Sequence, residues 1–127
     1  MIIDTDILVW VLRQHPGAIR FVERLPFLER KLSAVSYLEI LFGARDASDL
    51  SRLTKHISSQ YANIIMLSES ITESAIQLME RFALSHRPGE NEVLIAATAL
   101  RNGEILATGN VKHFDFIPGL QLKIFKP

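Results

Sequence analysis

The sequence predicts an α/β protein, a three-layer α/β/α sandwich around a mostly parallel central sheet. Short apolar segments of strand length alternate with longer segments of helical periodicity along the chain. Turn residues, such as Pro16-Gly17 and Pro88-Gly89, separate these segments. Because parallel strands need crossover connections, this alternation indicates βα units whose helices cover both faces of a sheet.

The expected elements follow from local signals taken in order. An apolar segment ends at Asp4 and predicts a buried first strand, after which Thr5 is expected to cap a helix. Further along, Ser36 and Glu39 have the spacing of a capping box at a helix start. The strands are expected at residues 1–3, 31–35, 63–67, 104–108 and 120–125. The helices are expected at residues 5–13, 18–24, 36–45, 50–58, 71–83 and 92–102.

Length and composition limit the classes of protein to which the chain can belong. The 127 residues suit a single domain over 1–127 with its own core. No apolar run approaches the ~20 residues that span a bilayer, and the first residues carry acids where a secretion signal carries bases. The chain has no cysteine, which excludes thiolate chemistry and fits a cytoplasmic protein. Lys plus Arg equals 14 and Asp plus Glu equals 14, so RNA binding would need a local basic patch or bridging metal ions.

Several polar side chains are expected at one edge of the sheet, beyond the carboxyl ends of the strands. Asp4 ends the first strand, and Asn110 follows the segment at 104–108. Glu39 and Glu92 fall in the expected first turns of two helices. Each acid alone could simply favour a helix dipole, but a carboxylate at the tip of a buried strand is costly unless paired or bound to a cation. Together they fit a hard divalent ion such as Mg²⁺, which activates water against phosphodiesters.

Four segments in sequence order resemble the PIN-domain ribonucleases of the VapC toxin type. The start IIDTDIL is similar to the family's opening apolar-Asp-Thr stretch, and SAVSYLEI followed by GAR is similar to its Glu-centred motif. The segment NEVLIAATA resembles its third motif, which normally begins with Asp. TGNVKHF followed by IPGL resembles its closing segment. These segments extend over nearly the whole chain.

The resemblance implies a metal-dependent endoribonuclease using Mg²⁺ or Mn²⁺. The catalytic positions that carry over are Asp4, Glu39, Glu92 and Asn110, with Asp4 and Glu92 as metal ligands. The supporting positions are Thr5, Asp6 and Thr108. Glu92 departs from the family's Asp and is one methylene longer, and Glu90 could compensate for this difference.

The resemblance also implies partners: an RNA substrate, a cognate antitoxin protein and a second copy of the chain in a homodimer. An antitoxin that places a basic side chain in the acidic site would be favoured by charge complementarity. Candidate RNA contacts, which could equally be solvated surface charges, are Arg13, Arg45, Arg87 and Lys112.

Two other functions remain open at this point. A PIN domain with an impaired site, as Glu92 allows, would serve as a protein- or RNA-binding module. Asp4-Thr5-Asp6 after an apolar strand also resembles the nucleophile motif of haloacid-dehalogenase-type phosphatases. Those enzymes need a late acidic pair, and here the segment after Gly109 offers only Asp115.

Overall fold

The computed structural model describes residues 1–127 and contains one five-stranded sheet in which every pair of neighbouring strands is parallel. The strands are β1 (Ile2–Ile3), β2 (Lys31–Ser33), β3 (Asn63–Ile65), β4 (Leu106–Thr108) and β5 (Leu122–Ile124). Their order is β3-β2-β1-β4-β5, so β1 is the central strand. Each strand lies within its predicted range, and the parallel sheet is confirmed.

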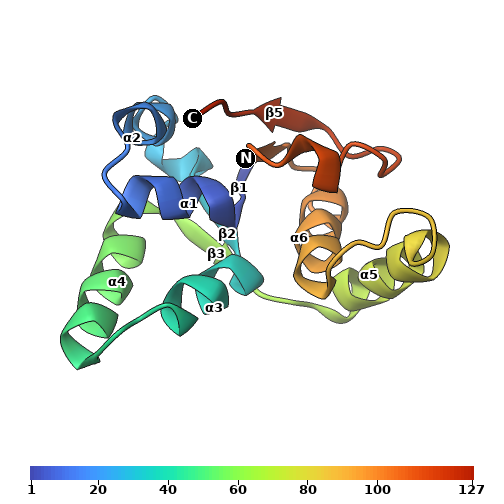
Figure 1. The fold of residues 1–127 in the computed structure, drawn as a ribbon, viewed down its shortest axis with the longest axis horizontal. Helices are drawn as coiled ribbons and strands as arrows, with labels where there is room; N and C mark the ends of the chain where they lie inside the picture. Colours follow the sequence, from blue (N-terminus) through green and yellow to red (C-terminus); the bar gives the residue numbers. More distant parts are fainter.

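Six α-helices and two short 3₁₀ helices connect the strands (Figure 1). The α-helices are α1 (Thr5–Leu12), α2 (Pro16–Glu23), α3 (Ala34–Phe42), α4 (Ala47–Gln60), α5 (Glu69–Phe82) and α6 (Glu90–Arg101). The 3₁₀ helices are η1 (Phe27–Glu29) and η2 (Val111–His113). None of the helices is long and apolar enough to cross a membrane.

The two faces of the sheet build separate parts of the core, because alternate residues of a strand point to opposite faces. Ile3 and its register partner Ala107 belong to a buried cluster with α1, α2 and α4. Ile2 and its partner Leu106 belong to a second cluster with α6. Figure 1 shows the same division, with α1, α2 and α4 on one side of the strands and α5 and α6 on the other. The layers are therefore helix, sheet and helix, as predicted.

Two predicted helix caps are wrong, because in each case an earlier side chain caps the helix. The helices α2, α4, α5 and α6 begin two or three residues before their predicted starts. Asp4, and not Thr5, is the N-cap of α1, and its Oδ1 accepts a hydrogen bond from the Thr5 backbone N–H. Ser33 is the N-cap of α3, so Ser36 lies inside the helix and forms no capping box with Glu39. Both helices begin as soon as the preceding strand ends, which moves Glu39 from the predicted first turn to the second.

Candidate active site

Asp4 lies at the carboxyl end of the central strand and is almost fully buried, with 5% of its surface exposed. Its Oδ1 accepts the Thr5 backbone N–H at 2.8 Å, and its Oδ2 accepts the Thr108 hydroxyl at 2.7 Å. Both donors are neutral, and no cationic side chain forms an ion pair with this carboxylate. Asp4 therefore carries buried charge that the protein itself does not neutralise.

Asp6 adds a second carboxylate to the same environment. Its Oδ1 accepts the Ile7 backbone N–H at 2.8 Å, and its Oδ2 accepts the Gly109 backbone N–H at 2.9 Å. Burial raises the pKa of Asp4 to about 7, with a further rise from the Asp6 charge and an opposing effect of the Thr108 hydrogen bond. Burial likewise raises the pKa of Asp6. Asp4 is thus poised to bind either a proton or a metal cation near neutral pH, with the Asp6 carboxylate beside it.

Gly109 allows Asp6 to approach the loop after β4. A Cβ at residue 109 would lie 2.7 Å from Asp6 Oδ2 and 3.2 Å from the carbonyl oxygen of Phe125. No side chain fits at either distance without displacing its neighbour. The glycine of the TGN segment therefore has a steric role that the sequence did not reveal.

Glu39 reaches the site from α3 and is held by a hydroxyl network. Thr5 Oγ1 donates to Glu39 Oε1 at 3.0 Å and lies 2.9 Å from the hydroxyl of the buried Ser36. Thr5 therefore links α1 to α3. Thr5, predicted as a supporting residue, lines the same cavity as these acids.

Glu92 enters from the first turn of α6, as predicted. Its Oε1 lies 3.5 Å from Nδ1 of His113, which is on η2. A Cβ at residue 89 would lie 3.2 Å from the same oxygen, so Gly89 leaves room for the longer side chain. His113 was missed by the sequence analysis. The one feature of the sequence that could have indicated it is its spacing of three residues from Asn110, which places both residues on the same 3₁₀ turn.

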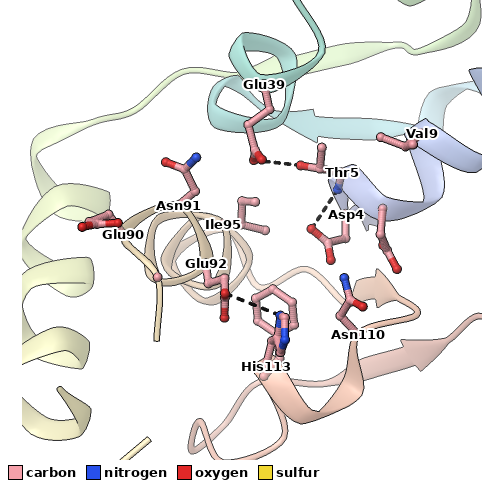
Figure 2. Close-up of a pocket in the computed structure, with 13 residues that line it drawn as sticks. Asp4, Thr5, Val9, Glu39, Glu90, Asn91, Glu92, Ile95, Asn110 and His113 are labelled. Carbon is pink, nitrogen blue, oxygen red and sulfur yellow. Dashed lines mark hydrogen bonds and ion pairs between the residues drawn. The ribbon is translucent and has the colours of Figure 1, made fainter. Parts of the chain in front are cut away.

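These side chains line one cavity of about 410 Å³ (Figure 2). Figure 2 shows Asp4 and Asn110 on one side of it, Glu92 and His113 on another, and Glu39 reaching in from α3. The lining includes all four predicted catalytic positions together with Thr5, Asp6 and Glu90. Thr108 is fully buried beneath Asp4 and supports the Asn110 backbone N–H, which donates to Thr108 Oγ1 at 2.9 Å.

The predicted basic residues are not all near this cavity. Arg13 and Arg45 line a groove that adjoins it. Arg87 and Lys112 line neither the cavity nor that groove, and Arg87 adopts a left-handed backbone conformation with φ of 48°. The structure thus brings two of the four predicted RNA contacts close to the acids.

The residues present fit a hard divalent cation. The donors are carboxylate oxygens and the Asn110 side-chain amide, and Asp4 and Asp6 lack a countercharge. No three acidic or imidazole side chains are already gathered as a metal-binding cluster. Mg²⁺ commonly uses one or two protein carboxylates and keeps several waters, so it does not require such a cluster.

Comparison with known proteins identifies the family. The model of the PIN domain family matches residues 1–117. Ribonuclease VapC19 of Mycobacterium tuberculosis is 33% identical over 123 residues, which cover 94% of this chain and 96% of that protein. Ribonuclease VapC1 of Haemophilus influenzae is 27% identical over 124 residues, with 94% and 92% covered.

Solved structures agree with this assignment. A chain in a toxin–antitoxin complex from Klebsiella pneumoniae is 28% identical and superimposes with a TM-score of 0.76, covering 94% of this chain and 93% of that one. A chain of VapBC2 from Rickettsia felis, 23% identical with a TM-score of 0.85, covers 98% of both chains and supports the fold. These matches place the chain with the PIN-domain proteins and not with the phosphatases considered above. The chain belongs to the PIN-domain family and, within it, to the VapC ribonucleases.

Proposed function

We propose that this chain is a metal-dependent endoribonuclease that hydrolyses RNA phosphodiester bonds in the acidic cavity. The observation that carries the proposal is the buried Asp4, which faces the cavity with a second carboxylate beside it and no cationic partner. A buried carboxylate without a countercharge is costly in a purely structural role. Divalent cation binding removes that cost, and the polyanionic substrate then becomes compatible with the site.

Asp4 and Glu92 would hold Mg²⁺ or Mn²⁺ between β1 and α6. The ion, when bound, supplies charge stabilisation for the phosphate and a water of lowered pKa. Thr108 fixes Asp4 from below, and the Gly109 backbone fixes Asp6. Asn110 is placed to orient substrate oxygens or waters at the cavity wall, and Glu39 is held by Thr5 on the opposite wall, where it can accept a proton from water.

The longer Glu92 is compatible with this role. Gly89 provides space for its carboxylate, and the first turn of α6 brings it to the cavity with the favourable end of the helix dipole. The Nδ1 atom of His113 lies 3.5 Å from this carboxylate, on the side of η2. Glu90, also on the cavity wall, is the nearest alternative carboxylate on the same helix turn.

The biological role we propose is that of the toxin in a toxin–antitoxin pair. The structural relatives include a toxin–antitoxin complex, which supports an antitoxin partner for this chain. A basic antitoxin side chain entering the cavity would compete with the metal ion for Asp4 and its neighbours. We further propose that the single domain works as a homodimer in the cytoplasm, where its RNA substrate is found.

A second candidate is an RNA- or protein-binding module that does not cleave. One observation favours it: the Glu92 carboxylate lies 3.5 Å from the ring of His113, which could keep it from a metal ion. The two candidates differ in whether the cavity binds metal and whether RNA is cut.

The deciding experiment incubates purified chain, freed of any partner, with structured and unstructured RNA in EDTA, Mg²⁺ or Mn²⁺. Asp4→Asn is the test variant, and Asp115→Asn, which removes an exposed carboxylate outside the cavity, is the matched control. Metal-dependent cleavage that persists in Asp115→Asn and disappears in Asp4→Asn is expected. No cleavage in any condition, together with no metal binding by calorimetry, would favour the binding module.

A further inference from the structure

A groove of about 520 Å³ adjoins the acidic cavity between α1, α3 and α4. Val9 and Glu39 line both the cavity and the groove, so the two are continuous at these residues. Its cationic lining comes from Arg13, Arg45 and Arg52. An extended strand that leaves the acidic cavity past Glu39 would therefore meet arginines.

Two of these arginines are positioned by one carboxylate. Asp49, in the first turn of α4, has a side chain only 8% exposed. Its Oδ1 accepts Arg52 Nε at 3.1 Å and Nη2 at 2.7 Å, and its Oδ2 accepts Arg45 Nε at 3.4 Å and the Arg45 backbone N–H at 3.1 Å. The Arg52 hydrogen bond, with those of Arg45, holds the pKa of Asp49 below its usual range. The Asp49 backbone N–H donates to the N-cap Asp46 Oδ1 at 2.7 Å, which anchors Asp49 at the start of α4.

The arrangement leaves the outer donors of both guanidinium groups unused. Arg45 contacts Asp49 only through Nε, and Arg52 only through Nε and Nη2, so both terminal nitrogens of Arg45 and Nη1 of Arg52 have no partner in the structure. The side chains of Arg45 and Arg52 are 83% and 55% exposed. Exposed ion pairs of this kind contribute little to stability. Exposed guanidinium groups with free donors suit phosphate oxygens, which they bind in a forked geometry.

We propose that this groove is a binding subsite for the RNA strand, in which Arg45 and Arg52 bind backbone phosphates and Asp49 is their positioning residue. The subsite rests on the proposed ribonuclease function and deepens it. The acidic cavity repels the phosphates on either side of the bond to be cut, and the neighbouring arginines offset that repulsion for the part of the strand that lies in the groove. Arg13 adds a third positive charge along the same wall.

The first test measures RNA binding as a function of salt. The probe is a fluorescein-labelled 12-nucleotide single-stranded RNA, with every protein carrying Asp4→Asn so that the probe is not cut. Each phosphate contact contributes about 0.7 to the slope of log affinity against log salt concentration for single strands. Removing both contacts with Arg45→Ala and Arg52→Ala should lower the slope by about 1.4 and weaken binding at 0.1 M salt roughly 25-fold.

The matched control is the double variant Arg20→Ala and Arg24→Ala. It removes the same charge from α2, where neither residue lines the cavity or the groove. An unchanged slope in this control is expected. Equal losses in the two double variants would mean that RNA responds only to total charge, and the proposal would be overturned.

The second test concerns Asp49 and uses the cleaving protein. Asp49→Asn keeps the size of the side chain but removes the charge that holds both arginines, so KM for the 12-mer should rise severalfold with a smaller change in kcat. The melting temperature, measured alongside, controls for folding. A change in melting temperature without a change in KM or in the salt slope would make Asp49 merely structural and refute its positioning role.

Failure of the groove proposal can be distinguished from failure of the proposed ribonuclease function. If the wild-type chain cuts RNA and the double variant Arg45→Ala and Arg52→Ala binds the 12-mer normally, the subsite is refuted and the ribonuclease function is not. If the wild-type chain does not cut RNA, the nuclease function is refuted, and the binding assay still decides whether the groove binds RNA. Normal RNA binding combined with arginine-dependent binding of an acidic 12-residue peptide would assign the groove to a protein partner and overturn the proposal.

Discussion

Replacing Asp4 with Asn should abolish cleavage and yet make the metal-free protein more stable at high pH. Asn keeps the shape of Asp4, and its Oδ1 can accept the Thr5 N–H as before. The bond to Thr108 reverses, because the Thr108 hydroxyl donates to Asp4 Oδ2 in the wild type and the Asn Nδ2 would donate to Thr108 Oγ1 instead. What it removes is the buried negative charge. Most single substitutions destabilise a protein, so a gain here would be a specific consequence of that charge.

The magnitude follows from the pKa shift. Burial raises the pKa of Asp4 from 3.8 to about 7, so between these values the folded protein retains a proton that the unfolded chain has lost. The free energy of unfolding therefore falls as pH rises through this window, by about 1.4 kcal/mol per unit of pH. About two units of the window lie above pH 5, so the advantage of Asn over Asp should grow by about 3 kcal/mol between pH 5 and pH 8.

Urea unfolding in EDTA at pH 5 and pH 8 measures this difference directly. Asp115→Asn, as a surface control, should stay within about 0.5 kcal/mol of the wild type at both pH values. Adding Mg²⁺ to one hundred times its Kd should stabilise the wild type by about 2.7 kcal/mol and leave Asp4→Asn unchanged. An Asn advantage that is the same at pH 5 and pH 8 would refute the reasoning, because it would show that Asp4 carries no extra charge cost in the fold.

Three further substitutions probe the groups around Asp4. Thr108→Val removes the 2.7 Å hydrogen bond to Asp4, which is worth about 1.5–3 kcal/mol to a charged group, so the rise of the cleavage rate with pH should move to higher pH in a pH–rate profile. Gly109→Ala places a Cβ 2.7 Å from Asp6 Oδ2 and should cost about 1–3 kcal/mol in urea unfolding as well as most of the activity; a stable, active variant would contradict the steric argument. Glu92→Asp withdraws the carboxylate from the cavity and should weaken Mg²⁺ binding about tenfold by calorimetry, whereas tighter binding would show that Glu92 is an impairment.

The sequence predicted the sheet and the acidic edge because both depend on short-range signals. Asp4 follows one apolar strand, and Gly109 and Asn110 follow another. Because the two strands pair in parallel, their carboxyl ends lie at the same edge of the sheet, and the residues that follow them are brought together there. Glu92 was correctly placed in a first helical turn, since Gly89 marks the preceding break. Predicting the parallel sheet and the acidic residues at its edge therefore needed only the order of strands and helices along the chain.

The errors came from features that depend on three-dimensional contacts. Ser33 and Ser36 are equally good caps by residue type, and only the strand end decides between them. His113 lies on a 3₁₀ turn with no periodicity that would predict its direction. The clearance that requires Gly109 is set by Asp6, which is 103 residues away in the chain. No local rule connects positions so distant in sequence.

The net charge of zero is the feature that sequence reasoning handled least well. It indicated only that RNA binding would need a local basic patch or bridging metal ions, because a sum over the chain carries no information about position. In the fold the charges are segregated: Asp4, Asp6 and Glu92 line the cavity, and Arg45 and Arg52, which contact Asp49, line the adjoining groove. A neutral chain can thus present a centre suited to a cation beside a wall suited to phosphates. For a protein that must admit a polyanion to an acidic site, this local alternation of charge matters more than the total.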